Sequence, residues 1–99
     1  MKRITTMIIT YNHEAFIAKA IESVVRQKGD FEHEILISDN GSADGTRAIV
    51  REYAARYPSL IKDVSNDVNI GISGNMKKCF NLATGDYIAM LEGDRKSVV

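Results

Sequence analysis

Four short apolar stretches alternate with three amphipathic stretches along the chain. The apolar stretches are rich in β-branched residues, as buried strands are, and span residues 3–10, 33–38, 60–65 and 86–91. The amphipathic stretches repeat their apolar residues at helical spacing and span residues 14–27, 46–57 and 72–84. Gly29 follows the first predicted helix, Pro58 stops the second, and Gly85 is expected to cap the third. The predicted order is β-α-β-α-β-α-β.

This alternation predicts an α/β fold with a mostly parallel sheet and helices on both faces. A helix between two strands allows the right-handed crossover that parallel neighbours require. In such sheets ligands bind beyond the carboxyl ends of the strands. The polar segments that follow the four predicted strands are Thr10-Tyr11-Asn12, residues 39–46, residues 66–71 and Glu92-Gly93-Asp94. We therefore expect all four to meet at one edge of the sheet.

Composition is that of an ordinary globular domain, or of part of a larger one. Of the 99 residues, 44% are hydrophobic and 26% are charged. Thirteen basic residues balance thirteen acidic ones, which argues against a nucleic-acid partner. The first apolar run is too short for a signal peptide or a membrane span. We expect a cytoplasmic protein, with peripheral attachment to the inner face of the membrane as a variant.

The segment that follows the second predicted strand has two interpretations. It is a turn in which Ser42 or Asp44 caps the next helix, because hydroxyl and carboxylate oxygens accept hydrogen bonds from free helical N–H groups. Asp39 precedes that first helical turn and stands where the strand leaves the sheet. For Asp39 we therefore favour contact with a ligand.

Glu92 and Asp94 place two carboxylates one residue apart at the end of the fourth predicted strand. Gly93 between them allows the backbone to bend so that both approach one cation. Two carboxylates this close repel each other unless a positive charge lies between them. A hard divalent ion that also binds phosphate oxygens meets that requirement. The alternative is a solvated acidic loop without a metal.

Four motifs of this chain resemble the N-terminal, nucleotide-binding half of family 2 glycosyltransferases, which have the Rossmann-like GT-A fold. The motifs are MIITYNHEAFIAKAIESVVRQ, EILISDNGSADGT, NDVNIGISGN and GDYIAMLEGD, within residues 4–94. The resemblance implies transfer of a sugar from a nucleotide diphosphate sugar, expected to be a UDP-sugar, with inversion at the anomeric carbon. The acceptor is not specified by these motifs, and a glycan or a lipid-linked sugar would fit.

The resemblance also implies a role for each matched residue. The residues that would contact the nucleotide are Thr10, Tyr11, Asn12, Asp39, Asn69 and Gly71. Among these, Asp39 would accept a hydrogen bond from the base, typically from N3–H of uracil. Glu92 and Asp94 would hold Mn²⁺ or Mg²⁺ on the diphosphate, where the metal stabilises charge on the leaving group.

The last five residues depart from the family pattern. The resemblance divides the chain into a nucleotide-sugar-binding part, residues 1–94, and an atypical tail, residues 95–99. In the family, a second half supplies the catalytic base and most of the acceptor site, so we expect a truncated domain that is inactive alone. Its unpaired sheet edge would allow a homo-oligomer. The alternatives are a non-catalytic nucleotide-binding module and a different nucleotide-dependent transferase.

Overall fold

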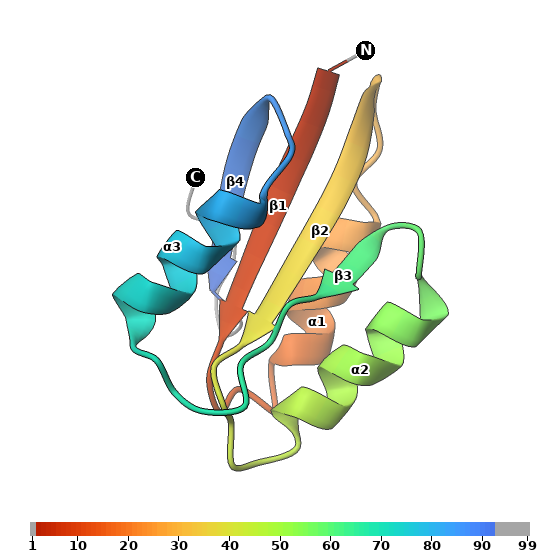
Figure 1. Ribbon diagram of the computed structural model, residues 1–99. Helices are drawn as coiled ribbons and strands as arrows, with labels where there is room; N and C mark the ends of the chain where they lie inside the picture. Colours follow the sequence, from red (N-terminus) through yellow and green to blue (C-terminus); the bar gives the residue numbers. More distant parts are fainter. Residues whose placement is uncertain (1, 93–99) are drawn as a thin grey trace.

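The computed structural model describes residues 2–92 and has the predicted order of elements (Figure 1). The strands are β1 (Lys2–Thr10), β2 (Phe31–Asp39), β3 (Ile61–Asp63) and β4 (Tyr87–Glu92). The helices are α1 (Ile17–Val25), α2 (Thr46–Arg56) and α3 (Ile72–Leu82). None of the helices within residues 2–92 is long and apolar enough to cross a membrane.

The sheet is parallel in all its strand pairs and has the order β3-β2-β1-β4. Thr10 at the end of β1 pairs with Asp39 at the end of β2, and Ile9 pairs with Glu92 at the end of β4. This register aligns the carboxyl ends of three strands. Figure 1 shows the loops that follow β1 and β2 at that end of the sheet, as predicted.

The two faces of the sheet are covered differently. Figure 1 shows α3 on one face, and α1 with α2 on the other. The apolar core lies on the side of α1 and α2; its buried members are Ile8, Ile17, Ala20, Ile21, Val24, Ile35, Ile37, Val50, Tyr53, Ile61 and Leu91. No residue of α3 belongs to this cluster, and the side chains that α3 buries are Asn75 and Cys79. Helices on both faces confirm the predicted layering.

Two predicted boundaries were wrong, the start of α1 and the length of β3. Helix α1 begins at Ile17 and not at Glu14, because residues 13–16 form a turn in which the carbonyl of His13 accepts hydrogen bonds from the N–H groups of Phe16 and Ile17, each at 2.9 Å. Strand β3 has three residues and not six. After it, the Asp63 carboxylate accepts a hydrogen bond from the N–H of Ser65 at 3.1 Å, which turns the chain.

The predicted cap of the third helix was also wrong. Helix α3 ends at Leu82, and Ala83 after it is already extended, with φ −67° and ψ 136°. Gly85 instead lies against β1, where its N–H donates to Thr5 Oγ1 at 2.9 Å. A Cβ at Gly85 would approach the Thr5 nitrogen to 2.6 Å, so close contact between the chain and β1 explains the glycine.

A buried carboxylate, which the sequence pattern did not reveal, joins β1, β2 and the segment before β4. Glu34 is 2% exposed and accepts hydrogen bonds from Thr5 Oγ1 at 2.7 Å and from the N–H and Oγ1 of Thr84, each at 3.0 Å. Lys62 Nζ lies 3.2 Å from the same carboxylate. Burial raises the pKa of Glu34, but the hydrogen bonds from Thr5, Thr84 and Lys62 outweigh it and lower this pKa to about 2.

Candidate functional site

A cavity of about 340 Å³ lies at the carboxyl end of the sheet. Its wall combines the ends of β1 and β4, the segments that follow β1, β2 and β3, and the start of α3; the lining residues are Ile9, Thr10, Tyr11, His13, Asn40, Asn69, Ile72 and Glu92. This volume falls within the range of small-molecule binding sites. Four of the predicted site residues therefore share one cavity: Thr10, Tyr11, Asn69 and Glu92.

The turn after β1 presents Tyr11 to the cavity. Thr10 is buried, and its hydroxyl lies 3.0 Å from Nδ1 of His13. The N–H of Tyr11 donates to the same nitrogen at 3.4 Å, so the imidazole of His13 contacts two consecutive residues of the turn. Tyr11 is 43% exposed, which leaves an aromatic residue accessible to a ligand.

Asn12 connects the turn after β1 to the loop after β2. Its φ of 53° lies in the left-handed region, which asparagine tolerates better than most residues. Its N–H donates to Ser42 Oγ at 2.8 Å, and its Oδ1 accepts from the N–H of Ala43 at 2.9 Å. Asn12 is not one of the cavity-lining residues, and its contact with a nucleotide stays a prediction.

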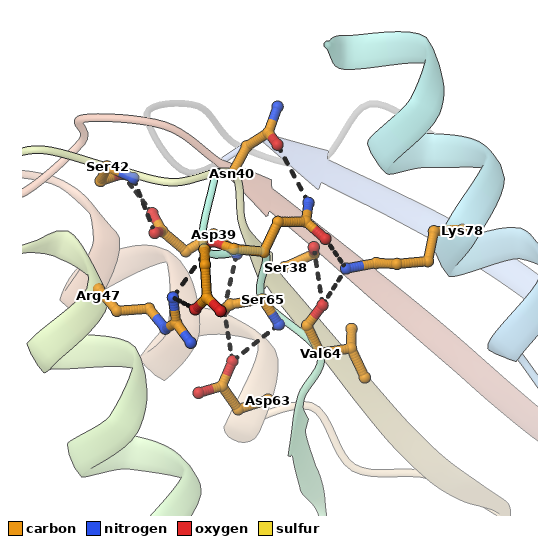
Figure 2. A network of polar contacts seen from close by, with 11 residues as sticks. Ser38, Asp39, Asn40, Ser42, Arg47, Asp63, Val64, Ser65 and Lys78 are labelled. Atoms are coloured by element: carbon orange, nitrogen blue, oxygen red, sulfur yellow. Dashed lines mark hydrogen bonds and ion pairs between the residues drawn. The ribbon is translucent and has the colours of Figure 1, made fainter. Parts of the chain in front are cut away.

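Asp39 is fully buried, is not one of the cavity-lining residues, and holds the loop that follows β2 (Figure 2). Its carboxylate accepts hydrogen bonds from the N–H of Ser42 at 3.0 Å and from the Ser42 hydroxyl. Its own N–H donates to Ser65 Oγ at 3.0 Å. The position at the end of β2 agrees with the sequence pattern, and recognition of a base by Asp39 stays a prediction.

The predicted cap of the second helix was wrong, because neither Ser42 nor Asp44 is its N-cap residue. The N-cap position itself is Gly45, and the carboxylate of Asp44 accepts from the N–H of Thr46 at 2.9 Å. The hydrogen bond from the Thr46 hydroxyl is the main cause that lowers the pKa of Asp44. Glu14 accepts from the N–H of Gly45 at 2.8 Å, so a second carboxylate joins the first turn of α2 to the segment before α1.

Two glycines with positive φ lie in the segments that follow β2 and β3. Gly41 has φ 78°, and a Cβ there would lie 2.8 Å from the backbone of Val68 and Asn69, so only glycine lets these two loops touch. Gly71 has φ 86° and precedes the first residue of α3. The N–H of Gly71 donates to Asn69 Oδ1 at 2.7 Å, which joins the two predicted loop residues within one tight turn.

Glu92 is the last residue of β4 and lines the cavity, whereas Asp94 lies outside the described residues. Within residues 2–92 there is no group of three histidine, cysteine or acidic side chains that would hold a metal unaided. Mg²⁺ and similar ions need fewer protein ligands when phosphate oxygens and water complete their coordination. A carboxylate at the cavity therefore fits a metal carried by a phosphorylated ligand.

Four of the cavity-lining residues were not among the predicted site residues: Ile9, His13, Asn40 and Ile72. Asn40 is the most deeply connected of the four. Asn40 is 3% exposed and lines the cavity. The sequence predicted only a turn for the segment in which it follows Asp39. Its side-chain partners Asn66, Asn69, Ile70 and Gly71 are 26 to 31 residues away. No local pattern reveals such contacts.

The comparisons with known proteins agree with this architecture. The family model described as glycosyl transferase family 2 matches residues 5–95. An uncharacterized protein of Mycobacterium tuberculosis is 41% identical over 86 residues, which are 87% of this chain and 25% of that protein. An uncharacterized glycosyltransferase of Mycoplasma pneumoniae is 37% identical over 94 residues, covering 93% of this chain and 31% of that protein.

Solved structures share the fold. The mannosyltransferase PcManGT from Pyrobaculum calidifontis, in complex with GDP-Man and Mn²⁺, superposes with a TM-score of 0.81 at 25% identity, over 94% of this chain and 28% of that chain. S. aureus TarS 1-349 in complex with UDP gives 0.79 at 26% identity, over 95% and 28%. This chain belongs to glycosyl transferase family 2 and has the Rossmann-like fold of its GT-A members. It spans between a quarter and a third of the length of these relatives.

Proposed function

We propose that the cavity binds the nucleoside diphosphate of a sugar donor and that this chain is the donor-binding part of a glycosyltransferase. The observation that carries the proposal is the position of the cavity, at the carboxyl ends of three aligned parallel strands and lined from four separate segments. Two structures that share the fold contain GDP-Man with Mn²⁺ and UDP. Both ligands are of the class proposed here.

For the base we propose uracil. The half-exposed ring of Tyr11 offers a face on which a flat pyrimidine can stack. Asp39 lies at the end of β2, directly across from Thr10, and a carboxylate there is suited to accept the imide N–H of uracil. Because Ser42 already donates to Asp39, the base would share this carboxylate, which has lone pairs for more than two donors.

For the diphosphate we propose a divalent ion, Mn²⁺ or Mg²⁺, held by Glu92 and Asp94. When bound, such an ion neutralises the charge that grows on the departing diphosphate. The residues of this chain would position the diphosphate and its metal. Asn69 and Gly71 form the turn that faces the ligand, and Glu92 at the end of β4 sets the side of the cavity on which the phosphates lie.

The proposed reaction of the complete enzyme is an inverting transfer. An acceptor hydroxyl attacks the anomeric carbon, the bond from that carbon to the diphosphate oxygen breaks on the opposite side, and a base takes the hydroxyl proton. We assign that base to none of residues 2–92. The 99-residue chain is therefore proposed to bind the donor without transferring the sugar by itself.

Calorimetry with UDP, GDP and ADP, each in the presence of Mn²⁺, tests the proposal. We expect tighter binding for UDP than for ADP, because the adenine ring of ADP has no N–H that could donate to Asp39. GDP, whose guanine ring has such an N–H, tests whether the site prefers the smaller pyrimidine. Equal affinities for the three would refute the base assignment, and no binding of any would refute the donor site. Asn81→Ala serves as a control, because Asn81 is an exposed residue of α3 that does not line the cavity.

A further inference from the structure

Asn40 lies between the end of β2 and the segment Asn66–Gly71, which leads into α3. Its backbone N–H donates to the carbonyl of Thr10 at 2.9 Å and so continues the pairing of β2 with β1 for one more residue. The residue is 3% exposed, yet it lines the cavity. It therefore connects a fixed part of the sheet with the wall of the proposed site.

The side-chain amide of Asn40 uses its full hydrogen-bonding capacity on this one segment. Nδ2 donates to Asn69 Oδ1 at 3.0 Å and to the carbonyl of Gly71 at 3.3 Å. Oδ1 accepts from Asn66 Nδ2 at 3.1 Å and from the N–H of Ile70 at 3.0 Å. Two donors and two acceptor sites are all that a primary amide has, so every one of them holds the segment.

The start of the same segment is also held from α3 (Figure 2). Lys78 Nζ donates to Asn66 Oδ1 at 2.6 Å and to the carbonyl of Val64. Asn75, which is fully buried, accepts from Asn66 Nδ2 at 3.0 Å and from the Ser38 hydroxyl at 2.5 Å. None of these bonds reaches Asn69, Ile70 or Gly71. Asn40 alone among these side chains contacts the half of the segment that faces the cavity.

From this arrangement we infer that Asn40 is a positioning residue that sets the shape of residues 69–71 and, through it, the affinity of the cavity for a nucleoside diphosphate. The second part rests on the function proposed above. Without the amide, the turn is held by the bond from the Gly71 N–H to Asn69 and by backbone constraints. If the turn then keeps its present shape for a tenth of the time, the dissociation constant rises about tenfold.

The test compares Asn40→Ala with Asn75→Ala in the 99-residue chain. Both substitutions remove a buried amide from one connected network, so both are expected to lower the melting temperature. Only the first is expected to accelerate hydrogen exchange at the N–H groups of Ile70 and Gly71. Only the first is expected to raise the dissociation constant for UDP with Mn²⁺ by about tenfold. Binding is measured at a temperature where circular dichroism shows both variants fully folded.

The outcomes separate this inference from the proposed function. Equal losses of affinity in the two variants, or unchanged exchange at Ile70 and Gly71 in Asn40→Ala, would overturn the positioning role and leave the donor site standing. A wild-type chain that binds no nucleotide would overturn the donor site. In that case exchange at Ile70 and Gly71 still decides whether Asn40 holds the turn.

Discussion

Glu34→Gln should remove most of the stabilisation that the ionised Glu34 carboxylate gives to the fold, a stabilisation that is lost in acid. Glu34 is almost fully buried and accepts hydrogen bonds from Thr5 and Thr84, with Lys62 beside it. Its pKa of about 2 lies below the ordinary 4.5, so the ionised carboxylate is favoured in the folded chain. At about 1.36 kcal/mol for each pH unit, the difference corresponds to about 3 kcal/mol of folding free energy at neutral pH. That is a large share of the roughly 5–15 kcal/mol by which small domains are stable.

The sign of the pH dependence follows from the direction of the shift. Because the folded-state pKa is lower than the unfolded-state pKa, the stabilisation is fully present above about pH 4.5 and is lost as the pH falls towards about 2. Of the total, about 2 kcal/mol should be lost between about pH 7 and about pH 3. Glutamine cannot ionise, so the variant should lack this part of the acid sensitivity.

Urea denaturation at a series of pH values measures the effect. Glu32→Gln is the matched control, because it removes the same charge from the same strand at an exposed position. Both carboxylates lie near Arg3, at 3.8 Å for Glu32 and 3.5 Å for Glu34. We expect the free energy of unfolding of Glu34→Gln to approach that of the wild type as the pH falls, while Glu32→Gln runs nearly parallel to the wild type. If Glu34→Gln also ran parallel to the wild type down to about pH 3, the low pKa of Glu34 would be wrong.

Three further predictions concern the site. Asp39→Ala should weaken UDP binding by about 1–3 kcal/mol, the usual cost of leaving a hydrogen-bonding partner unpaired, and calorimetry that shows an unchanged dissociation constant would limit Asp39 to its contact with Ser42. Saturation with UDP at about 100 times its dissociation constant should stabilise the fold by roughly 2.7 kcal/mol. Mn²⁺ should add to this stabilisation in thermal melts of the wild type but not of Glu92→Ala. An equal increment in both proteins would show that Glu92 does not bind the metal. Gly41→Ala should lower the free energy of unfolding by about 1–3 kcal/mol, because it forces a side chain into the left-handed region and against Val68; a loss of only a few tenths in urea denaturation would mean that the loop relaxes.

The order of the elements could be predicted because each strand and helix carries its own period. The β-branched runs and the helical stripes are local signals, and the parallel arrangement that brings Thr10, Asp39 and Glu92 to one edge of the sheet follows from their alternation. The ends of elements were predicted less well. Gly85 had the pattern of a helix cap, but its close contact with Thr5 is a tertiary constraint that no local pattern contains.

The candidate site was predictable to the extent that its residues follow strands directly. Thr10, Tyr11 and Glu92 reach the cavity because they stand at or just beyond strand ends. Asn40 was missed because its four side-chain bonds go to a segment more than 25 residues away. Glu34 was missed for a related reason: a glutamate in a strand predicts an exposed position, and only the assembled sheet brings Thr5 and Thr84 to it.

The two layers that cover the sheet should respond to temperature in opposite ways. Helices α1 and α2 contact it through the apolar cluster, whose contribution weakens on cooling and carries a large heat-capacity change. Helix α3 is joined to the sheet by the hydrogen bond between Asn75 and Ser38, and to the segment after β3 by Lys78. These contacts are polar, and exposure of polar surface changes the heat capacity in the opposite sense to exposure of apolar surface. Warming should therefore release α3, together with the segment that leads into it, before the core melts. The wall of the cavity would then loosen as a sub-global opening, at a temperature below that of the main unfolding transition.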